Sequence, residues 1–233
     1  SLVLLWIAGP NALFCSDPKT KRLRTYRPNT GAEQSWPPYI DRQDRVWLLT
    51  LGRLCLFYPE TGQTVEYPKN LKNAQQINVL DIAEDDQNQL WVSTWNNGLY
   101  LYNPVTDDLE RHDKNGWGGL IRRNLPDRTP EGRPFLWVGG GNTGLYLYFP
   151  DRRFKQELLN DPRDPYSHNG LYASYPFKDD RTGDVWIGTE LGLEHYSPTA
   201  IRFGRAIIPQ EPDFGPFNMV SGAVPDLSDT ARA

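Results

Sequence analysis

Hydrophobic and polar residues alternate along short stretches of this chain, and turn-forming residues separate the stretches. Leu99 to Tyr102 and Val79 to Ala83 are examples. A period of two residues is typical of a β-strand that buries one face. The 20 Gly and 20 Pro among 233 residues supply frequent turns. The pattern therefore predicts an all-β chain in which long helices are scarce.

One strand pattern recurs five times. It consists of a branched residue, Trp, a branched or small residue, and then Gly or Thr. The copies occupy residues 5–9, 46–50, 90–94, 136–140 and 185–189. Their tryptophans, Trp6, Trp47, Trp91, Trp137 and Trp186, are 41, 44, 46 and 49 residues apart. Five copies in register indicate an internal structural repeat.

The residues around each Trp repeat as well. After the third Trp strand, Asn97-Gly98 predicts a tight hairpin turn, and a strand ending in Asn103-Pro104 follows. A further strand ends in an aromatic residue or His, and one more strand with an acidic turn precedes each Trp. Each unit is thus predicted to hold four antiparallel strands, A to D, with Trp on strand B. Four strands in 40 to 50 residues are typical of a propeller blade.

The predicted fold is therefore an all-β propeller of five four-stranded blades, forming one domain over residues 1–233. The blades are expected at residues 1–27 with 217–226, 38–68, 77–112, 119–156 and 170–203. Val220, Ala223 and Asp226 match the strand A positions Val79, Ile82 and Asp85. The C-terminal strand is thus expected to complete the first blade and close the ring, since a closed ring leaves no sheet edge open. The alternative is an arc cut from a larger propeller.

The five periodic tryptophans are expected in the core. One Trp at the same position of every blade would fill the gap between neighbouring sheets, where it buries about 150–250 Å². Such burial stabilises the fold by about 4–6 kcal/mol before the opposing entropy is counted. Stability alone therefore accounts for these residues.

Charge and cysteine content exclude several other classes of protein. A net charge of −4 and a pI near 5.4 disfavour nucleic-acid binding, which needs a basic face. No apolar run reaches the roughly 18 residues of a membrane helix, so no direct membrane insertion is expected of this segment. Cys15 and Cys55 fall in equivalent hairpins of neighbouring blades and are expected as buried free thiols. Two cysteines without a His-rich motif predict neither a structural zinc nor any other metal or cofactor.

Three tryptophans break the period and suggest a ligand-binding face. Trp36 and Trp117 lie in connections from strand D to the next strand A, and Trp95 lies in a B–C turn. Antiparallel geometry places these two kinds of connection on the same face of a propeller, where a flat ligand such as a sugar ring could stack. The candidate ligand-binding residues are Trp36, Arg53, Trp95, Asn96, Trp117, Asn142 and His168. The alternative is that each Trp merely covers its own loop.

No catalytic residue is predicted. His112 ends a strand D and His195 lies in a strand C, so only His168 is expected on the candidate face. The carboxylates expected within reach of this face are Glu33, Asp164, Glu190 and Asp213. Glycoside hydrolysis needs two of them facing each other at about 5–10 Å, which a sequence does not reveal.

Residues 179 to 196 closely resemble the two-component regulator propeller repeat, and so do residues 84 to 102. This repeat typifies the periplasmic sensor region of hybrid two-component histidine kinases of Bacteroidetes-type bacteria. The resemblance implies a periplasmic location, recognition of an oligosaccharide, neighbouring sensor or kinase domains in a longer chain, and possible homodimers. The motif is structural, so it transfers the fold more firmly than the ligand.

The leading hypothesis is a non-catalytic sensor propeller that binds a carbohydrate on the D–A/B–C face and takes part in signal transduction. One alternative is an enzyme on the same fold, either a glycoside hydrolase or a lyase of the streptogramin-inactivating kind. The other is a platform for protein interaction, which would show an extended rim in place of a pocket.

Overall fold

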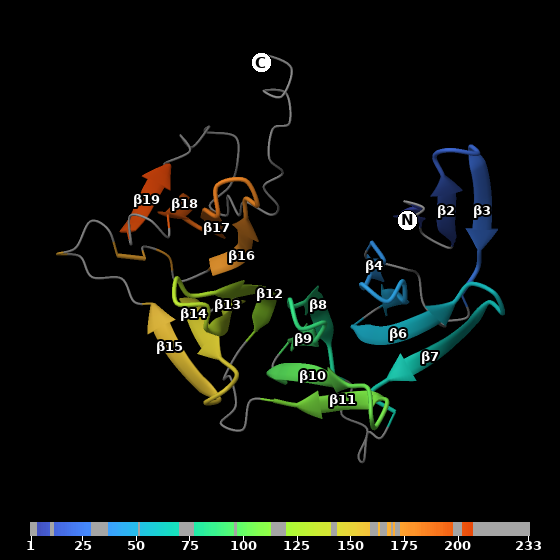
Figure 1. Cartoon of the computed structure of the whole chain (residues 1–233), viewed down its shortest axis with the longest axis horizontal. Helices are drawn as coiled ribbons and strands as arrows, with labels where there is room; N and C mark the ends of the chain where they lie inside the picture. Colours follow the sequence, from blue (N-terminus) through green and yellow to red (C-terminus); the bar gives the residue numbers. More distant parts are fainter. Residues whose placement is uncertain are drawn as a thin grey trace. The chain divides into compact units, whose positions relative to one another are not determined.

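The described part of the structure, a computed structural model, consists only of β-strands and their connections (Figure 1). It comprises residues 4–9, 12–28, 37–50, 52–69, 77–95, 97–112, 120–140, 144–158, 163, 167–168, 170, 173–197 and 202–206. No helix among these residues is long and apolar enough to span a membrane. The chain divides into two compact units, residues 1–113 and 114–233, each of which is considered by itself.

The first unit contains three antiparallel sheets. They are β1 to β3 (Leu5–Ala8, Leu13–Asp17, Arg22–Tyr26), β4 to β7 (Tyr39–Ile40, Val46–Thr50, Arg53–Tyr58, Gln63–Tyr67) and β8 to β11 (Val79–Glu84, Leu90–Thr94, Leu99–Asn103, Asp108–Arg111). Within each sheet, every strand pairs with the strands that precede and follow it in the sequence, so hairpins connect the strands of a sheet. The fourth strand expected for the first blade, at residues 217–226, lies outside the described residues, and so does the expected closure.

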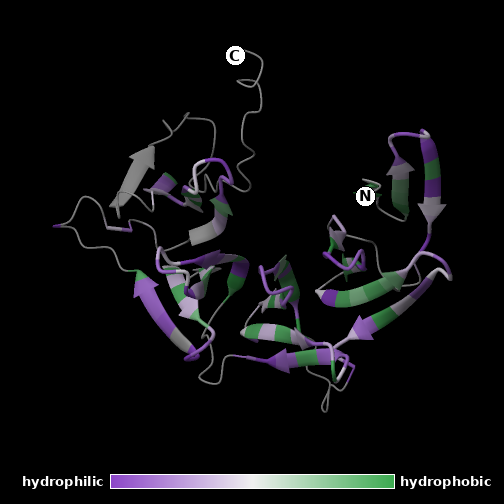
Figure 2. Ribbon diagram, in the orientation of Figure 1, coloured by the Kyte–Doolittle hydropathy of each residue, from purple (hydrophilic) through white to green (hydrophobic). Residues whose placement is uncertain are grey.

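The second unit contains two further sheets with the same topology. They are β12 to β15 (Ile121–Arg128, Pro134–Gly140, Gly144–Phe149, Phe154–Leu158) and β16 to β19 (Ala173–Lys178, Val185–Thr189, Gly192–Ser197, Arg202–Ala206). Figure 2 shows that β3 and β15, two of the fourth strands of the repeat, are mostly hydrophilic, whereas β6 is largely hydrophobic. The prediction of an all-β fold built from five small antiparallel sheets is confirmed.

The repeated tryptophans occupy equivalent places on the second strand of the repeat. Trp47, Trp91 and Trp137 are 0%, 1% and 2% exposed, as expected for core residues. Trp6 and Trp186 are only half-buried. The expectation that all five fill the core therefore holds fully for three of them.

An aspartate that precedes the Trp strand accepts a hydrogen bond from the indole of each of three tryptophans. The Nε1 atom of Trp47 donates to Asp41 Oδ2 at 2.8 Å, and Trp91 donates to Asp85 in the same way at 3.0 Å. A third bond of this kind, 3.0 Å long, joins Trp137 to Asp127. The sequence analysis noted the acidic turns but missed this bond. The signal was the constant six-residue spacing from Asp to Trp in the second and third copies.

The two cysteines are buried and free, as predicted. Burial is the main reason why the pKa of Cys55 rises to about 11 and the pKa of Cys15 is also raised. Both thiols therefore stay protonated near neutral pH, and they act as small core residues.

Candidate functional site

The B–C turns and the D–A connection of the first unit meet on one face. Val79 N donates to Gly52 O at 2.7 Å, and Trp95 N donates to Asn78 O at 2.7 Å. Gly52 has φ of 77°, and a Cβ there would lie 2.7 Å from Asn78 Oδ1, so this turn requires glycine. The end of the connection into β8 is thus fixed against the B–C turns of two neighbouring blades.

Two of the predicted ligand-binding residues are described on this face. The Trp95 side chain follows β9 and is 49% exposed. Arg53 begins β6, and its Nη1 lies 3.3 Å from Glu66 Oε2 in an exposed ion pair. Trp36, Asn96, Trp117 and Asn142 lie outside the described residues. The structure thus offers one exposed aromatic ring and one exposed cation near the B–C turns of the first unit.

His168 belongs to the second unit, where it is buried. Its Nδ1 atom lies 2.6 Å from Glu194 Oε2, and the two side chains are 1% and 3% exposed. Close by, a Cβ at Gly170 would lie 2.9 Å from Thr189 Cβ and 3.0 Å from Glu190 Oε2. The connection into β16 therefore packs tightly on the B–C turn of its blade. The imidazole of His168 therefore contacts a carboxylate inside the protein, and it is not exposed to solvent.

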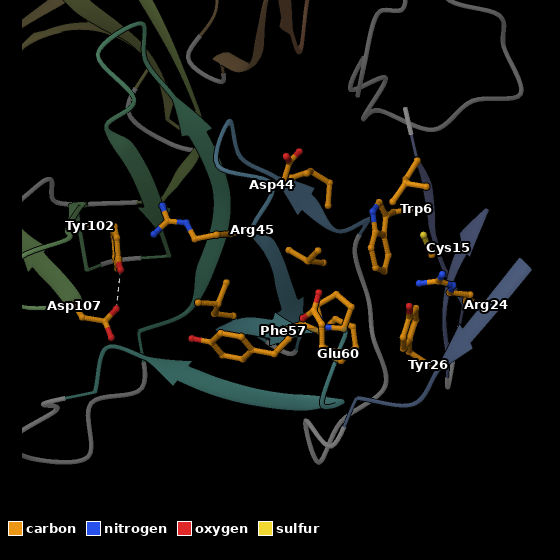
Figure 3. A pocket seen from close by; sticks show the side chains of 16 residues that line it. Trp6, Cys15, Arg24, Tyr26, Asp44, Arg45, Phe57, Glu60, Tyr102 and Asp107 are labelled. Carbon is orange, nitrogen blue, oxygen red and sulfur yellow. Dashed lines mark hydrogen bonds between the residues drawn. The ribbon is translucent and has the colours of Figure 1, made fainter. Parts of the chain in front are cut away.

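A pocket of about 880 Å³ lies in the first unit, between the sheets β1–β3 and β4–β7 (Figure 3). It is lined by Leu4, Trp6, Cys15, Arg24, Tyr26, Ile40, Asp44, Arg45, Val46, Leu56, Phe57, Tyr58, Pro59, Glu60, Tyr102 and Asp107. Asp44 lies in the A–B turn, and residues 58–60 lie at the C–D turn. These turns are at the opposite ends of the strands from the predicted face, so the sequence analysis missed the pocket.

Aromatic rings form one wall of the pocket. The Trp6 and Tyr26 rings are stacked, with centroids 5.7 Å apart and an interplanar angle of 25°. Phe57 meets Tyr26 edge-on, with centroids 5.3 Å apart. The polar lining includes two arginines and three carboxylates. Such a combination of apolar wall and few polar groups is typical of small-molecule sites, and the volume lies within their usual range of about 300–1,000 Å³.

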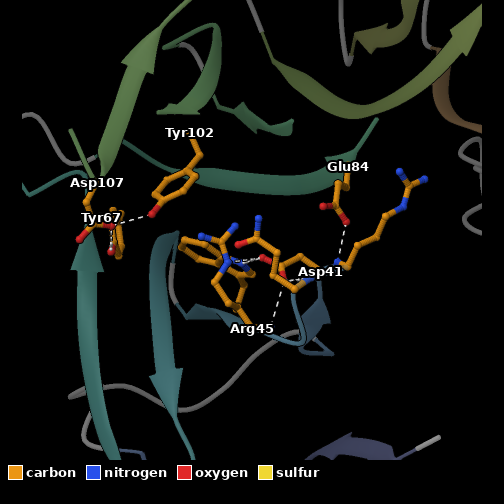
Figure 4. Close-up of polar contacts among 9 residues, drawn as sticks. Asp41, Arg45, Tyr67, Glu84, Tyr102 and Asp107 are labelled. Carbon is orange, nitrogen blue, oxygen red and sulfur yellow. Dashed lines mark hydrogen bonds and ion pairs between the residues drawn. The ribbon is translucent and has the colours of Figure 1, made fainter. Parts of the chain in front are cut away.

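A polar cluster borders the pocket at Asp107 (Figure 4). Its Oδ1 accepts hydrogen bonds from the hydroxyls of Tyr67 at 2.7 Å and Tyr102 at 2.6 Å, and Lys69 forms an ion pair with Oδ2. The Lys69 ammonium, followed by the Tyr102 hydroxyl, lowers the pKa of Asp107 to about 2. Burial, helped by the hydrogen bond to this carboxylate, raises the pKa of Tyr102 to about 12. The cluster therefore keeps an ionised carboxylate next to two neutral phenols.

Asp107→Asn is expected to lower the free energy of unfolding at pH 7 by less than about 1 kcal/mol, because half of the Asp107 side chain is exposed and solvent screens its charge. The pKa of this carboxyl is lowered from 3.8 to about 2. Its contribution is therefore present above pH 4 and is lost as the pH falls toward 2. Urea unfolding of both proteins at pH 7 and near pH 2 measures the effect. An equal difference at both pH values would contradict it.

Comparison with known proteins identifies the repeat. Residues 73–96 match the model of the two-component regulator propeller family. The structure is similar to the extracellular domain of a one-component system from B. thetaiotaomicron, with 20% identity and a TM-score of 0.67 over 87% of this chain and 26% of that one. The extracellular domain of a hybrid two-component system from the same organism shares 20% identity, with a TM-score of 0.63 over 86% of this chain and 28% of the other.

An enzyme also shares the fold. Virginiamycin B lyase from Staphylococcus aureus is 14% identical, with a TM-score of 0.63 over 90% of this chain and 68% of the lyase. No curated protein sequence matches the chain. At these identities the similar structures establish the all-β propeller fold alone. The chain spans about a quarter of the length of the bacterial extracellular domains.

Proposed function

We propose that this chain, which carries a two-component regulator propeller repeat, is a ligand-sensing module of a signalling protein and is not an enzyme. The match of residues 73–96 to the two-component regulator propeller family carries the proposal, because this repeat is named for two-component regulators. The likeness to extracellular domains of bacterial signalling systems supports a periplasmic location. Ligand binding would shift the population of arrangements between this module and a neighbouring sensor or kinase domain.

The proposed ligand is an oligosaccharide that binds at the D–A/B–C face. The exposed indole of Trp95 offers a flat apolar surface for a sugar ring. Arg53, at the neighbouring B–C turn, offers hydrogen-bond donors to hydroxyl groups. These two residues support the site on which the sequence analysis placed the ligand.

Trp95→Ala is expected to weaken oligosaccharide binding about tenfold, which corresponds to about 1.4 kcal/mol. Isothermal calorimetry of the whole chain against a panel of plant and host oligosaccharides provides the measurement. Val105→Ala is the matched control, because Val105 is a hydrophobic residue of the same sheet that is 91% exposed at the C–D turn. The affinity of the Val105→Ala variant for the oligosaccharide should equal that of the unchanged protein.

Two results would count against the proposal. One is the absence of binding to every oligosaccharide in the panel. The other is an equal, small effect of Trp95→Ala and Val105→Ala on a sugar that does bind, which would move the sugar site away from Trp95.

The likeness to a lyase makes an enzyme the second candidate. A variant of that lyase in which alanine replaces a histidine is described as catalytically inactive. In the described part of the chain two histidine–carboxylate pairs could supply an acid or a base, His168–Glu194 at 2.6 Å and His195–Asp184 at 3.0 Å. A catalyst must reach its substrate; His168 is 2% exposed, whereas the side chains of His195 and Asp184 are 30% and 21% exposed. Incubation with a streptogramin and with oligosaccharides, followed by mass spectrometry, should give no product. A product lost in His168→Ala would favour the enzyme.

A further inference from the structure

We propose that the pocket between the sheets β1–β3 and β4–β7 binds a guanidinium group, a planar organic cation. The inference goes beyond the oligosaccharide site and does not depend on it, because it concerns the ends of the blades that carry the A–B and C–D turns. The next blade of the same chain contains a guanidinium group bound in this way, that of Arg45.

Between the sheets β4–β7 and β8–β11, a guanidinium covers two rings of a cluster of three aromatic side chains. Trp47, Tyr67 and Tyr102 meet edge-on, with ring centroids 5.4 to 5.9 Å apart. The Arg45 Cζ atom lies 5.2 Å from the Trp47 centroid and 4.8 Å from that of Tyr102. Its Nε donates to the carboxylate of Asp41 at 2.6 Å. An aromatic face and a carboxylate together satisfy this cation.

Aromatic residues at the three equivalent positions line the pocket, two from the sheet β1–β3 and one from β6. The first two rings are stacked at 25°, whereas their counterparts Trp47 and Tyr67 meet at 64°. Strand register makes Trp6 equivalent to Trp47, because they pair with Cys15 and Leu56, respectively. Tyr26 likewise corresponds to Tyr67, since these residues pair with Leu13 and Leu54. Phe57 corresponds to Tyr102, because each follows the strand C residue that is paired with Trp. The aromatic triad of the pocket is therefore Trp6, Tyr26 and Phe57.

The residue that covers the triad differs between the two blades. Arg45 precedes Trp47 by two positions, and the residue two positions before Trp6 is Leu4. The Leu4 side chain is 42% exposed at the edge of the pocket. In the first blade this position thus supplies no cation, and a ligand can provide one.

The carboxylates in the pocket lining favour a cation over an anion. Asp44 and Glu60 are exposed acidic residues of the lining, and both are labelled in Figure 3. Of the two lining arginines, Arg45 is paired with Asp41. The lining as a whole holds three carboxylates and two arginines, so its net charge is negative.

The test is calorimetric titration of the whole chain with agmatine, a free guanidinium compound, and with a capped Ala-Arg-Ala tripeptide. 1,4-Diaminobutane, which carries ammonium in place of guanidinium, is the matched probe. Agmatine or the tripeptide should bind, and diaminobutane should bind several-fold more weakly, because guanidinium stacks on rings and pairs with carboxylates better than ammonium does. Binding of the tripeptide alone would identify a peptide as the source of the guanidinium.

Two sets of variants locate the site. Trp6→Ala should weaken agmatine binding by about 2- to 30-fold, the range expected for one cation–π contact. The double variant Asp44→Asn with Glu60→Gln should also weaken it, and it changes only exposed side chains, so the fold is retained. Trp95→Ala is the control and should leave agmatine binding unchanged. Added salt should reduce the affinity, because it screens the carboxylates.

The proposal is overturned if neither guanidinium probe binds at concentrations up to about 10 mM. It is also overturned if diaminobutane binds as well as agmatine, or if the double variant binds agmatine normally. A neutral oligosaccharide whose binding is lost in Trp6→Ala and kept in Trp95→Ala would assign the pocket to sugars instead.

Discussion

Trp47→Ala is expected to lower the free energy of unfolding by about 3–5 kcal/mol, the usual cost of removing a large buried aromatic side chain. Trp47 is fully buried, and its ring contacts Tyr67, Tyr102 and Arg45. The substitution also removes one donor from the carboxylate of Asp41, which is 3% exposed. Urea denaturation followed by circular dichroism measures the loss.

Two further variants separate burial from hydrogen bonding. Trp47→Phe retains an aromatic ring but lacks the indole N–H, so its loss should be smaller than that of Trp47→Ala. Trp95→Ala removes an indole that is 49% exposed and should change the stability by less than about 0.5 kcal/mol. Equal losses for Trp47→Ala and Trp95→Ala would show that the repeated position is not a core position.

Glu194→Leu is expected to destabilise the second unit by about 1–3 kcal/mol, because it removes the hydrogen-bond partner that lies 2.6 Å from the buried His168. The equivalent strand C positions of other blades hold Cys55, Tyr100 and Tyr146. A buried carboxylate at this position is therefore specific to the last blade. Thermal or urea unfolding of the whole chain provides the measurement.

A double-mutant cycle tests whether the pair acts as a unit. His168→Leu combined with Glu194→Leu removes both polar groups of the pair. Its loss should be well below the sum of the two single losses, with a coupling of about 1–3 kcal/mol. Additive losses would mean that the two side chains contribute independently.

The repeat could be predicted from the sequence because its signals are local. The strand around each Trp, the turn after it and the acidic turn before it lie within one stretch of 40 to 50 residues. The all-β fold and the buried free thiols of Cys15 and Cys55 followed from these patterns. No tertiary information was needed for either conclusion.

The pocket could not be predicted in this way, because its lining combines residues of three blades. The exposure of Trp6 and the burial of His168 likewise depend on what packs against each side chain, and neither residue carries a local signal of it. The hydrogen bond from Trp47 to Asp41 is an intermediate case. Its six-residue spacing is visible in the sequence, but only the structure shows that the two side chains meet.

The bond between indole and acidic turn lies within a single repeat, since Asp41 and Trp47, like Asp85 and Trp91, belong to the same sheet and its turn. Duplication or deletion of one repeat during evolution would thus carry the donor and the acceptor together. Lineages that descend from such a gene can gain or lose whole blades while a tryptophan bonded in this way keeps its carboxylate partner.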